Sequence, residues 1–268
     1  MNLCDTHCHI QSLGADSGEA GTRALWSKTD LTAAVLIRRA KEANVTRFIC
    51  VGCDLEDSRL ATDFADRFNA YASIGIHPHE AKRYVNRSKE LTRFVALAGK
   101  ERVVAIGECG LDYFYRHSEP EDQITLLRFQ LDLAAKVKLP VIFHVREAFA
   151  DFWPVYDSYP NIRAVLHSFT DTSATLDMAL ERGLYIGVNG IATFTRTPKM
   201  QEMFKSIPLE RLLLETDAPF LTPTPYRGNI NEPKQIVRIA EFLVELRHTT
   251  LDQLADTTTV NANRLFGL

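Results

Sequence analysis

The stretch Glu121–Lys138, followed by Pro140-Val141-Ile142-Phe143-His144, decides the fold. In its first part apolar side chains recur at three- and four-residue spacing, which is typical of an amphipathic helix. Its second part is a short apolar run that follows a proline and precedes a histidine, which is typical of a buried strand. A helix that leads directly into a buried strand is one unit of a βα alternation.

The same alternation extends over the chain in both directions. Apolar periodicity predicts further helices at residues 31–43, 172–182, 233–247 and 251–265. Short apolar runs predict eight strands, at residues 3–4, 47–51, 71–76, 103–106, 141–143, 163–166, 184–188 and 212–214. A chain of 268 residues is close to the roughly 250 residues of one eight-fold barrel. We therefore predict an α/β fold, a single TIM-type (β/α)8 barrel with extra C-terminal helices, as one domain over residues 1–268.

Composition predicts a folded protein without membrane segments. Hydrophobic residues make up 46% of the chain, which is enough for a large core, and no apolar run approaches the roughly 20 residues of a membrane span. The first residues lack a basic and apolar leader, and the five cysteines are an odd set, so we expect a cytoplasmic protein with reduced thiols. A net charge of −3 gives no general attraction to nucleic acid. Composition therefore neither favours nor excludes a nuclease.

Candidate metal ligands fall at the carboxyl ends of the predicted strands, where barrel enzymes build their active sites. His7 and His9 share one face of an extended backbone, because residues i and i+2 point the same way. The other candidates follow four later strands, and they are Glu108, His144, His167 and Asp217. Four imidazoles and two carboxylates exceed what one open metal needs, so we predict two divalent ions, with Glu108 able to bridge them. We expect Asp217 to bind one ion and to orient or deprotonate the attacking water.

Other residues on the same ends are candidates for substrate contacts. His77 ends the third predicted strand, where it either takes part in the reaction or hydrogen-bonds a loop. Arg146 lies two residues beyond a proposed ligand, where it either forks onto a phosphate or forms a buried salt bridge. Arg227 lies in a Pro- and Gly-rich loop after the eighth strand, a region where barrels frequently bind phosphate. The aromatic run Tyr113-Phe114-Tyr115 either offers stacking faces to an unpaired base or packs loops on the barrel.

One long polar stretch and several histidines and cysteines are not assigned to the site. The low-hydrophobicity stretch Gln11–Asp30 is predicted to be a long loop, either a surface insertion or a mobile cover for substrate with Trp26 at its tip. His79, His117 and His248 are predicted to be surface or loop residues, and Cys50-Val51-Gly52-Cys53 is predicted to hold inert thiols.

Seven segments, in order along the chain, resemble those of the TatD-type metal-dependent deoxyribonucleases: Asp5-Thr6-His7-Cys8-His9, Ile76-His77-Pro78-His79, Gly107-Glu108-Cys109-Gly110-Leu111-Asp112-Tyr113, His144-Val145-Arg146, His167-Ser168-Phe169, Leu214-Glu215-Thr216-Asp217-Ala218-Pro219 and Tyr226-Arg227-Gly228-Asn229. The resemblance implies an amidohydrolase-type barrel, divalent-metal dependence and hydrolysis of DNA, often as a 3′ exonuclease on single strands or 3′ ends. The departures are Gln11, where the family usually has an acidic residue, and Ala150 before Asp151, where the acidic residue after Arg146 is displaced.

By position, the resemblance carries metal ligation onto the six predicted ligands and a phosphate-side role onto His77 and Arg146. Catalytic roles accordingly fall on Asp217, Glu108 and His77, and substrate binding falls on Arg146, Arg227 and His77. Imidazole-rich ligation suits Zn or Mn, and the resemblance also admits Mg. We expect a monomer.

Two alternatives share the same residues. The first is an acyl or amide hydrolase on the same dinuclear site, such as an aminoacyl-tRNA deacylase, because the metal chemistry suits either electrophile. The second is a non-catalytic metal-binding protein. The complete ligand set and the two arginines favour a phosphodiesterase over both.

Overall fold

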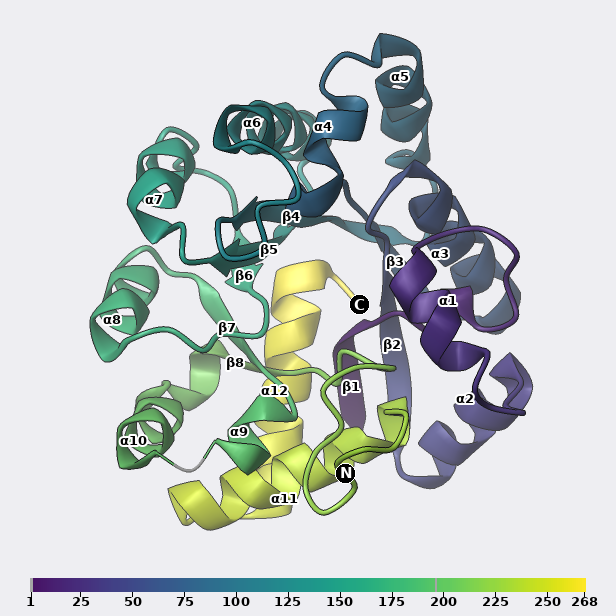
Figure 1. The fold of residues 1–268 in the computed structure, drawn as a ribbon. Coiled ribbons are helices and arrows are strands. Elements are labelled where there is room, and N and C mark those ends of the chain that lie inside the picture. The colour runs from purple at the N-terminus through teal and green to yellow at the C-terminus, as the bar shows by residue number, and fades with distance from the viewer. Residues whose placement is uncertain (1, 196) are drawn as a thin grey trace. The chain divides into compact units, whose positions relative to one another are not determined.

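The computed structural model, drawn in Figure 1, describes residues 2–195 and 197–268. These residues form two compact units. Unit 1 comprises the described residues of 1–16, 20–49 and 168–268, and unit 2 comprises residues 17–19 and 50–167. Within the described residues, no helix has the length and apolar character needed to cross a membrane. All five cysteines are buried thiols. The single domain over 1–268 stays a prediction.

Unit 1 holds the first and the last strands of the chain together with two long C-terminal helices. Helix α12 packs against β1 and β8 (Figure 1), and the residue before it, Thr250, caps it with a hydroxyl that accepts a hydrogen bond from the backbone N–H of Gln253. The strands are β1 (Leu3–Cys8), β2 (Val45–Val51, shared with unit 2), β7 (Tyr185–Val188) and β8 (Leu212–Leu214). The helices are η1 (Ile10–Ser12), α1 (Ala20–Trp26), α2 (Ala33–Glu42), α8 (Ser173–Glu181), α9 (Ile191–Phe194), α10 (Pro198–Ser206), η3 (Leu209–Arg211), η4 (Pro233–Gln235), α11 (Ile236–Arg247) and α12 (Leu251–Phe266).

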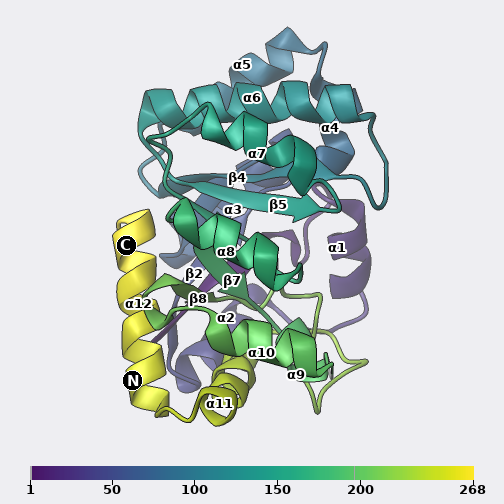
Figure 2. The same ribbon diagram turned by 90° about the vertical axis from the view of Figure 1, so that its left-hand side faces the viewer.

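Unit 2 holds the middle strands and the helices that cover them. Figure 2 shows α6 and α7 lying over β4 and β5, where their apolar faces are buried. The strands are β3 (Tyr71–Ile74), β4 (Val103–Asp112), β5 (Val141–Arg146) and β6 (Ala164–Leu166). The helices are α3 (Leu55–Phe68), η2 (Pro78–Glu80), α4 (Ala81–Tyr84), α5 (Ser88–Leu97), α6 (Pro120–Val137) and α7 (Phe149–Asp157).

The eight strands form one parallel sheet whose order follows the sequence, from β1 to β8. In unit 2, Gly110 and Asp112 of β4 pair with His144 and Arg146 of β5. In unit 1, β1 contacts β8, and the backbone N–H of Asp217 donates to the carbonyl of His7 at 2.8 Å. An eight-stranded parallel sheet in sequence order, alternating with helices, is the arrangement of a TIM-type barrel. The predicted fold class, with its extra C-terminal helices, is confirmed.

The prediction differs from the structure most where polar residues continue a strand. Strand β1 extends to Cys8, β4 to Asp112 and β5 to Arg146, so His7, Glu108 and His144 lie inside strands that were predicted to end before them. Their side chains are polar, but the backbone ladder continues through them because the neighbouring strand supplies partners. Strand β3 instead ends at Ile74, two residues earlier than predicted.

The loop predicted over Gln11–Asp30 contains helix α1 and does not carry Trp26 at an exposed tip. The Trp26 side chain is buried, and its indole N–H donates to the carbonyl of His9 at 3.0 Å. The interpretation of this segment as a mobile cover with Trp26 at its tip is therefore wrong. Burial of a large aromatic ring fixes the end of α1 against the first strand's exit.

Candidate metal sites

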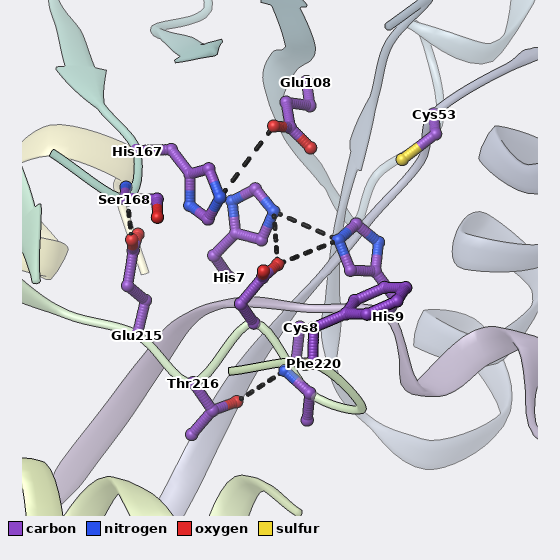
Figure 3. A network of polar contacts seen from close by, with 12 residues as sticks. His7, Cys8, His9, Cys53, Glu108, His167, Ser168, Glu215, Thr216 and Phe220 are labelled. Atoms are coloured by element: carbon purple, nitrogen blue, oxygen red, sulfur yellow. Dashed lines mark hydrogen bonds and ion pairs between the residues drawn. The ribbon is translucent and has the colours of Figure 1, made fainter. Parts of the chain in front are cut away.

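The first group of candidate ligands lies in unit 1, where β1 and the loop after β8 meet. His7 lies in β1 and His9 follows it, and their Nε2 atoms are 3.3 Å apart, with the rings turned toward each other (Figure 3). Asp217 Oδ1 lies 3.6 Å from His7 Nε2 and 3.3 Å from His9 Nε2. We call His7, His9 and Asp217 the first cluster. Two imidazole nitrogens and a carboxylate oxygen thus share one small space.

The backbone around the first cluster is tied by buried hydrogen bonds. The His9 N–H donates to the carbonyl of Ala218 at 2.7 Å, next to the bond from Asp217 to His7. Beneath them, the carboxylate of Asp5 accepts hydrogen bonds from the backbone and the hydroxyl of Thr216. Burial raises the pKa of Asp5 to about 7, against the lowering effect of those hydrogen bonds. The cluster is therefore held by β1 on one side and by residues 216–218 on the other.

The second group lies in unit 2, around the carboxylate of Glu108. Glu108 Oε1 is 3.1 Å from His144 Nδ1, 3.8 Å from His77 Nε2 and 3.9 Å from His167 Nε2, the last contact being visible in Figure 3. Glu108 and His144 come from β4 and β5, whereas His167 directly follows β6 and His77 lies in the loop after β3. We call Glu108, His77, His144 and His167 the second cluster. Burial, together with the neighbouring His144, lowers the pKa of His77 and keeps its ring neutral.

Asp112 also belongs to this neighbourhood, although no role was predicted for it. Its Oδ2 accepts from Nε2 of His144 at 2.9 Å and from Nε2 of His79 at 3.0 Å. Burial opposes its ionisation, but the hydrogen bonds from His144 and His79 hold its pKa well below the usual range. Burial likewise opposes a charge on His144, and its bonds with Asp112 and Glu108 nevertheless raise the pKa of His144 to about 9.

A signal for Asp112 was present in the sequence. Glu108, Gly110 and Asp112 alternate along β4, so Glu108 and Asp112 share one face of an extended strand. His79, predicted to be a surface or loop residue, lies in η2 with its side chain 27% exposed and bound to Asp112. Its contact depends on the turn at Pro78–Glu80, which the strand and helix periodicities do not reveal.

The donor sets of both clusters fit divalent metal ions. Ligands that lie 2.0–2.1 Å from a tetrahedrally coordinated ion are about 3.3 Å from one another. The contacts among His7, His9 and Asp217, at 3.3–3.6 Å, match this spacing, and donor atoms of His77, Glu108 and His144 lie within 4.8 Å of one another. Imidazole nitrogens and carboxylate oxygens that face one another at these distances can bind a shared cation. Nitrogen and oxygen ligands of this kind are typical of divalent ions such as Zn, Mn and Mg.

The two arginines predicted to bind substrate both lie on aromatic rings. Arg146 is the last residue of β5 and is exposed, with its guanidinium 3.9 Å from the ring centroid of Phe114 and 4.9 Å from that of Tyr115. Arg227 is 4.0 Å from the ring centroid of Phe194, and its Nη1 donates to the carbonyl of Thr222 at 3.0 Å. Exposure of Arg146 argues against a buried structural salt bridge as its role.

The chain has eight parallel strands in barrel order and clusters of histidines and carboxylates at the strand ends. This combination defines a metal-dependent hydrolase of the TIM-barrel class. The model of the TatD related DNase family matches residues 4–267. The chain belongs to this family, and the resemblance drawn from its motifs is confirmed.

Similar proteins agree with this membership. The chain is 36% identical over 268 residues to the "Uncharacterized metal-dependent hydrolase YabD" of Bacillus subtilis, with 98% of each chain covered. It is 38% identical over 242 residues to the "3'-5' ssDNA/RNA exonuclease TatD" of Erwinia amylovora, covering 87% of this chain and 93% of that protein. The crystal structure of YjjV, a TatD homolog from Escherichia coli, superposes with a TM-score of 0.86 at 28% identity, covering 99% of this chain and 98% of that one.

Proposed function

We propose that this protein is a divalent-metal-dependent exonuclease that removes nucleotides from the 3′ end of single-stranded nucleic acid by hydrolysis. The observation that carries the proposal is the pair of clusters, each of which combines imidazole nitrogens with a carboxylate. Membership of the TatD related DNase family supports hydrolysis of a phosphodiester bond. Relatives named as 3′-5′ ssDNA/RNA exonucleases support the polarity and the single-stranded substrate.

Two ions are part of the proposal, one held by His7, His9 and Asp217 and the other by Glu108, His144 and His167. When bound, such ions supply Lewis acidity to the phosphate and lower the pKa of water toward neutrality. Zn, Mn and Mg are all compatible with the donors, and imidazole-rich ligation favours Zn or Mn. His77 stays neutral beside Glu108 and is proposed to donate a hydrogen bond to a phosphate oxygen.

Asp217 is proposed to accept the proton of the attacking water. Its carboxylate is 13% exposed and lies within 3.6 Å of both histidines of the first cluster, so it is fixed and shielded from bulk solvent. Arg146 and Arg227 are proposed to bind phosphate oxygens, because a chain of net charge −3 must attract a polyanion locally. We also propose that the protein acts as a monomer in the cytoplasm.

The decisive experiment is a screen of metal-stripped protein, reconstituted separately with Mg, Mn and Zn. It uses single-stranded DNA, double-stranded DNA and RNA, each labelled at the 5′ end. We expect metal-dependent shortening of single strands one nucleotide at a time from the 3′ end. Intact nucleic acid with all three ions, together with cleavage of an ester or aminoacyl bond, would replace the nuclease by an acyl hydrolase.

A further inference from the structure

The loop between β4 and α6 carries the most exposed aromatic rings of unit 2. Phe114 and Tyr115 are 49% and 51% exposed, which is unusual for side chains of this size. Their neighbours Arg116 and His117 are exposed as well. We call residues 113–117 the aromatic loop. A group of exposed aromatic and cationic side chains on one loop is typical of a binding surface rather than of loop packing.

The rings of the aromatic loop are held in a defined arrangement. The ring of Tyr115 is nearly parallel to that of His117, at an interplanar angle of 9° and a centroid separation of 5.8 Å, and stands edge-on to Phe114. Arg146 lies over both Phe114 and Tyr115. Tyr113 anchors the loop from below, since its hydroxyl donates to Asp151 on α7 at 2.9 Å. The rings are therefore preorganised while remaining open to solvent.

Asp112 connects this loop to the second cluster through its two oxygens. Its Oδ1 accepts from the backbone N–H groups of Phe114 at 3.0 Å and Tyr115 at 2.9 Å. Its Oδ2 binds His144 and His79, and the ring of His79 stands edge-on to Tyr115 at 5.5 Å. One carboxylate thus fixes the aromatic loop directly beside a proposed metal ligand, within the same unit.

We infer that the aromatic loop is a nucleobase-stacking site, at which Tyr115 and Phe114 bind an unpaired base next to the phosphate that is cleaved. This inference rests on the proposed nuclease function and adds the residues that select unpaired substrate. Aromatic faces stack on any base, whereas a base inside a duplex already has its faces covered. Arg146, which lies over both rings, adds a positive charge that attracts the phosphates next to the stacked base. The occupant that this surface fits is a single-stranded end of a nucleic acid.

The test compares two kinds of single-stranded oligonucleotide with the metal-loaded protein. One kind is fully natural, and the other carries a tetrahydrofuran abasic residue at the last or the next-to-last 3′ position. The abasic substrate keeps the phosphates and loses only the base. For the wild type, we expect the abasic residue at one of these positions to lower kcat/KM by roughly 5- to 150-fold, the range that base stacking supplies.

Three variants assign this discrimination to the loop. In the double variant Phe114→Ala/Tyr115→Ala, natural and abasic substrates should be cleaved with nearly equal kcat/KM. Tyr115→Phe keeps the ring and should discriminate like the wild type. Tyr159→Ala is the matched control, because Tyr159 lies in the same unit but bonds to Asp132 on α6. Displacement of Arg146 in the double variant would slow both substrates alike, so the ratio reports on the base alone.

The outcomes separate this inference from the function on which it rests. Equal cleavage of natural and abasic strands by the wild type, or full discrimination by the double variant, would overturn the stacking site and leave the nuclease standing. Failure of the wild type to cleave any oligonucleotide would overturn both.

Discussion

The two ligand clusters differ in the number of histidines around the carboxylate and in what supports them. In the first cluster, His7 of β1 and His9 just after that strand face a single carboxylate, and His7 is fully buried. In the second cluster, three histidines that follow or belong to different strands surround Glu108. One of them, His144, is also hydrogen-bonded to Asp112, which accepts hydrogen bonds from the exposed aromatic loop as well. We propose that the first cluster holds and deprotonates the attacking water away from solvent. We propose that the second cluster positions the substrate, because the loop that Asp112 supports is exposed at the protein surface.

The largest effect that this comparison predicts comes from the carboxylate of the first cluster. Asp217→Asn keeps the size and one ligating oxygen of the side chain but cannot accept a proton, so kcat should fall by a factor on the order of 10² to 10⁴. Steady-state kinetics on a single-stranded oligonucleotide measures this fall.

The matched control for Asp217 is Asp256→Asn, because Asp256 is an exposed residue of α12 in the same unit. It should leave kcat unchanged. Near-normal turnover in Asp217→Asn would show that another group accepts the proton. The first cluster would then not differ from the second in the role proposed for it.

A smaller effect is expected from the residue that supports the second cluster. Asp112→Asn replaces an acceptor of two imidazole N–H groups, so His144 loses the partner that directs its Nδ1 toward Glu108. Loss of such a supporting hydrogen bond typically weakens metal binding by about 10- to 100-fold. Competition with a chelator measures the affinity, and the imidazole ¹⁵N shifts of His144 report its tautomer.

Asp132→Asn serves as the control for Asp112, because Asp132 is an exposed residue of α6 in the same unit. If Asp112→Asn bound metal as tightly as the wild type and left the His144 tautomer unchanged, Asp112 would be a loop anchor only.

Much of this architecture could be predicted from the sequence, because barrel strands and helices have different hydrophobic periods. The βα alternation located all eight strands, and the position of chemistry-bearing residues after apolar runs selected His7, Glu108 and His144. The ends predicted for these strands lie several residues before the ends in the structure. A polar residue stops a hydrophobic pattern, but it does not stop a hydrogen-bonded ladder such as the one that pairs Gly110 with His144.

The contacts of Asp112 and His79 could not be predicted in the same way. Their meeting requires both the register between β4 and β5 and the turn at Pro78–Glu80, which no local pattern encodes. The burial of Trp26 could not be predicted for a related reason, since its indole N–H donates to the carbonyl of His9, which is 17 residues away in the sequence. The sequence does not decide whether the aromatic loop stacks on bases or packs on the barrel, whereas the exposure of Phe114 and Tyr115 in the structure favours stacking.

Counting bound metal in two single variants tests the central claim most directly. Wild-type protein, stripped and reloaded with Mn or Zn, should bind close to two ions by elemental analysis, and His9→Ala and His144→Ala should each bind close to one. Nuclease activity should fall in both variants, because each cluster is proposed to hold its own ion. A wild-type protein that binds no divalent ion, or a complete loss of both ions in either single variant, would contradict this account of two metal sites.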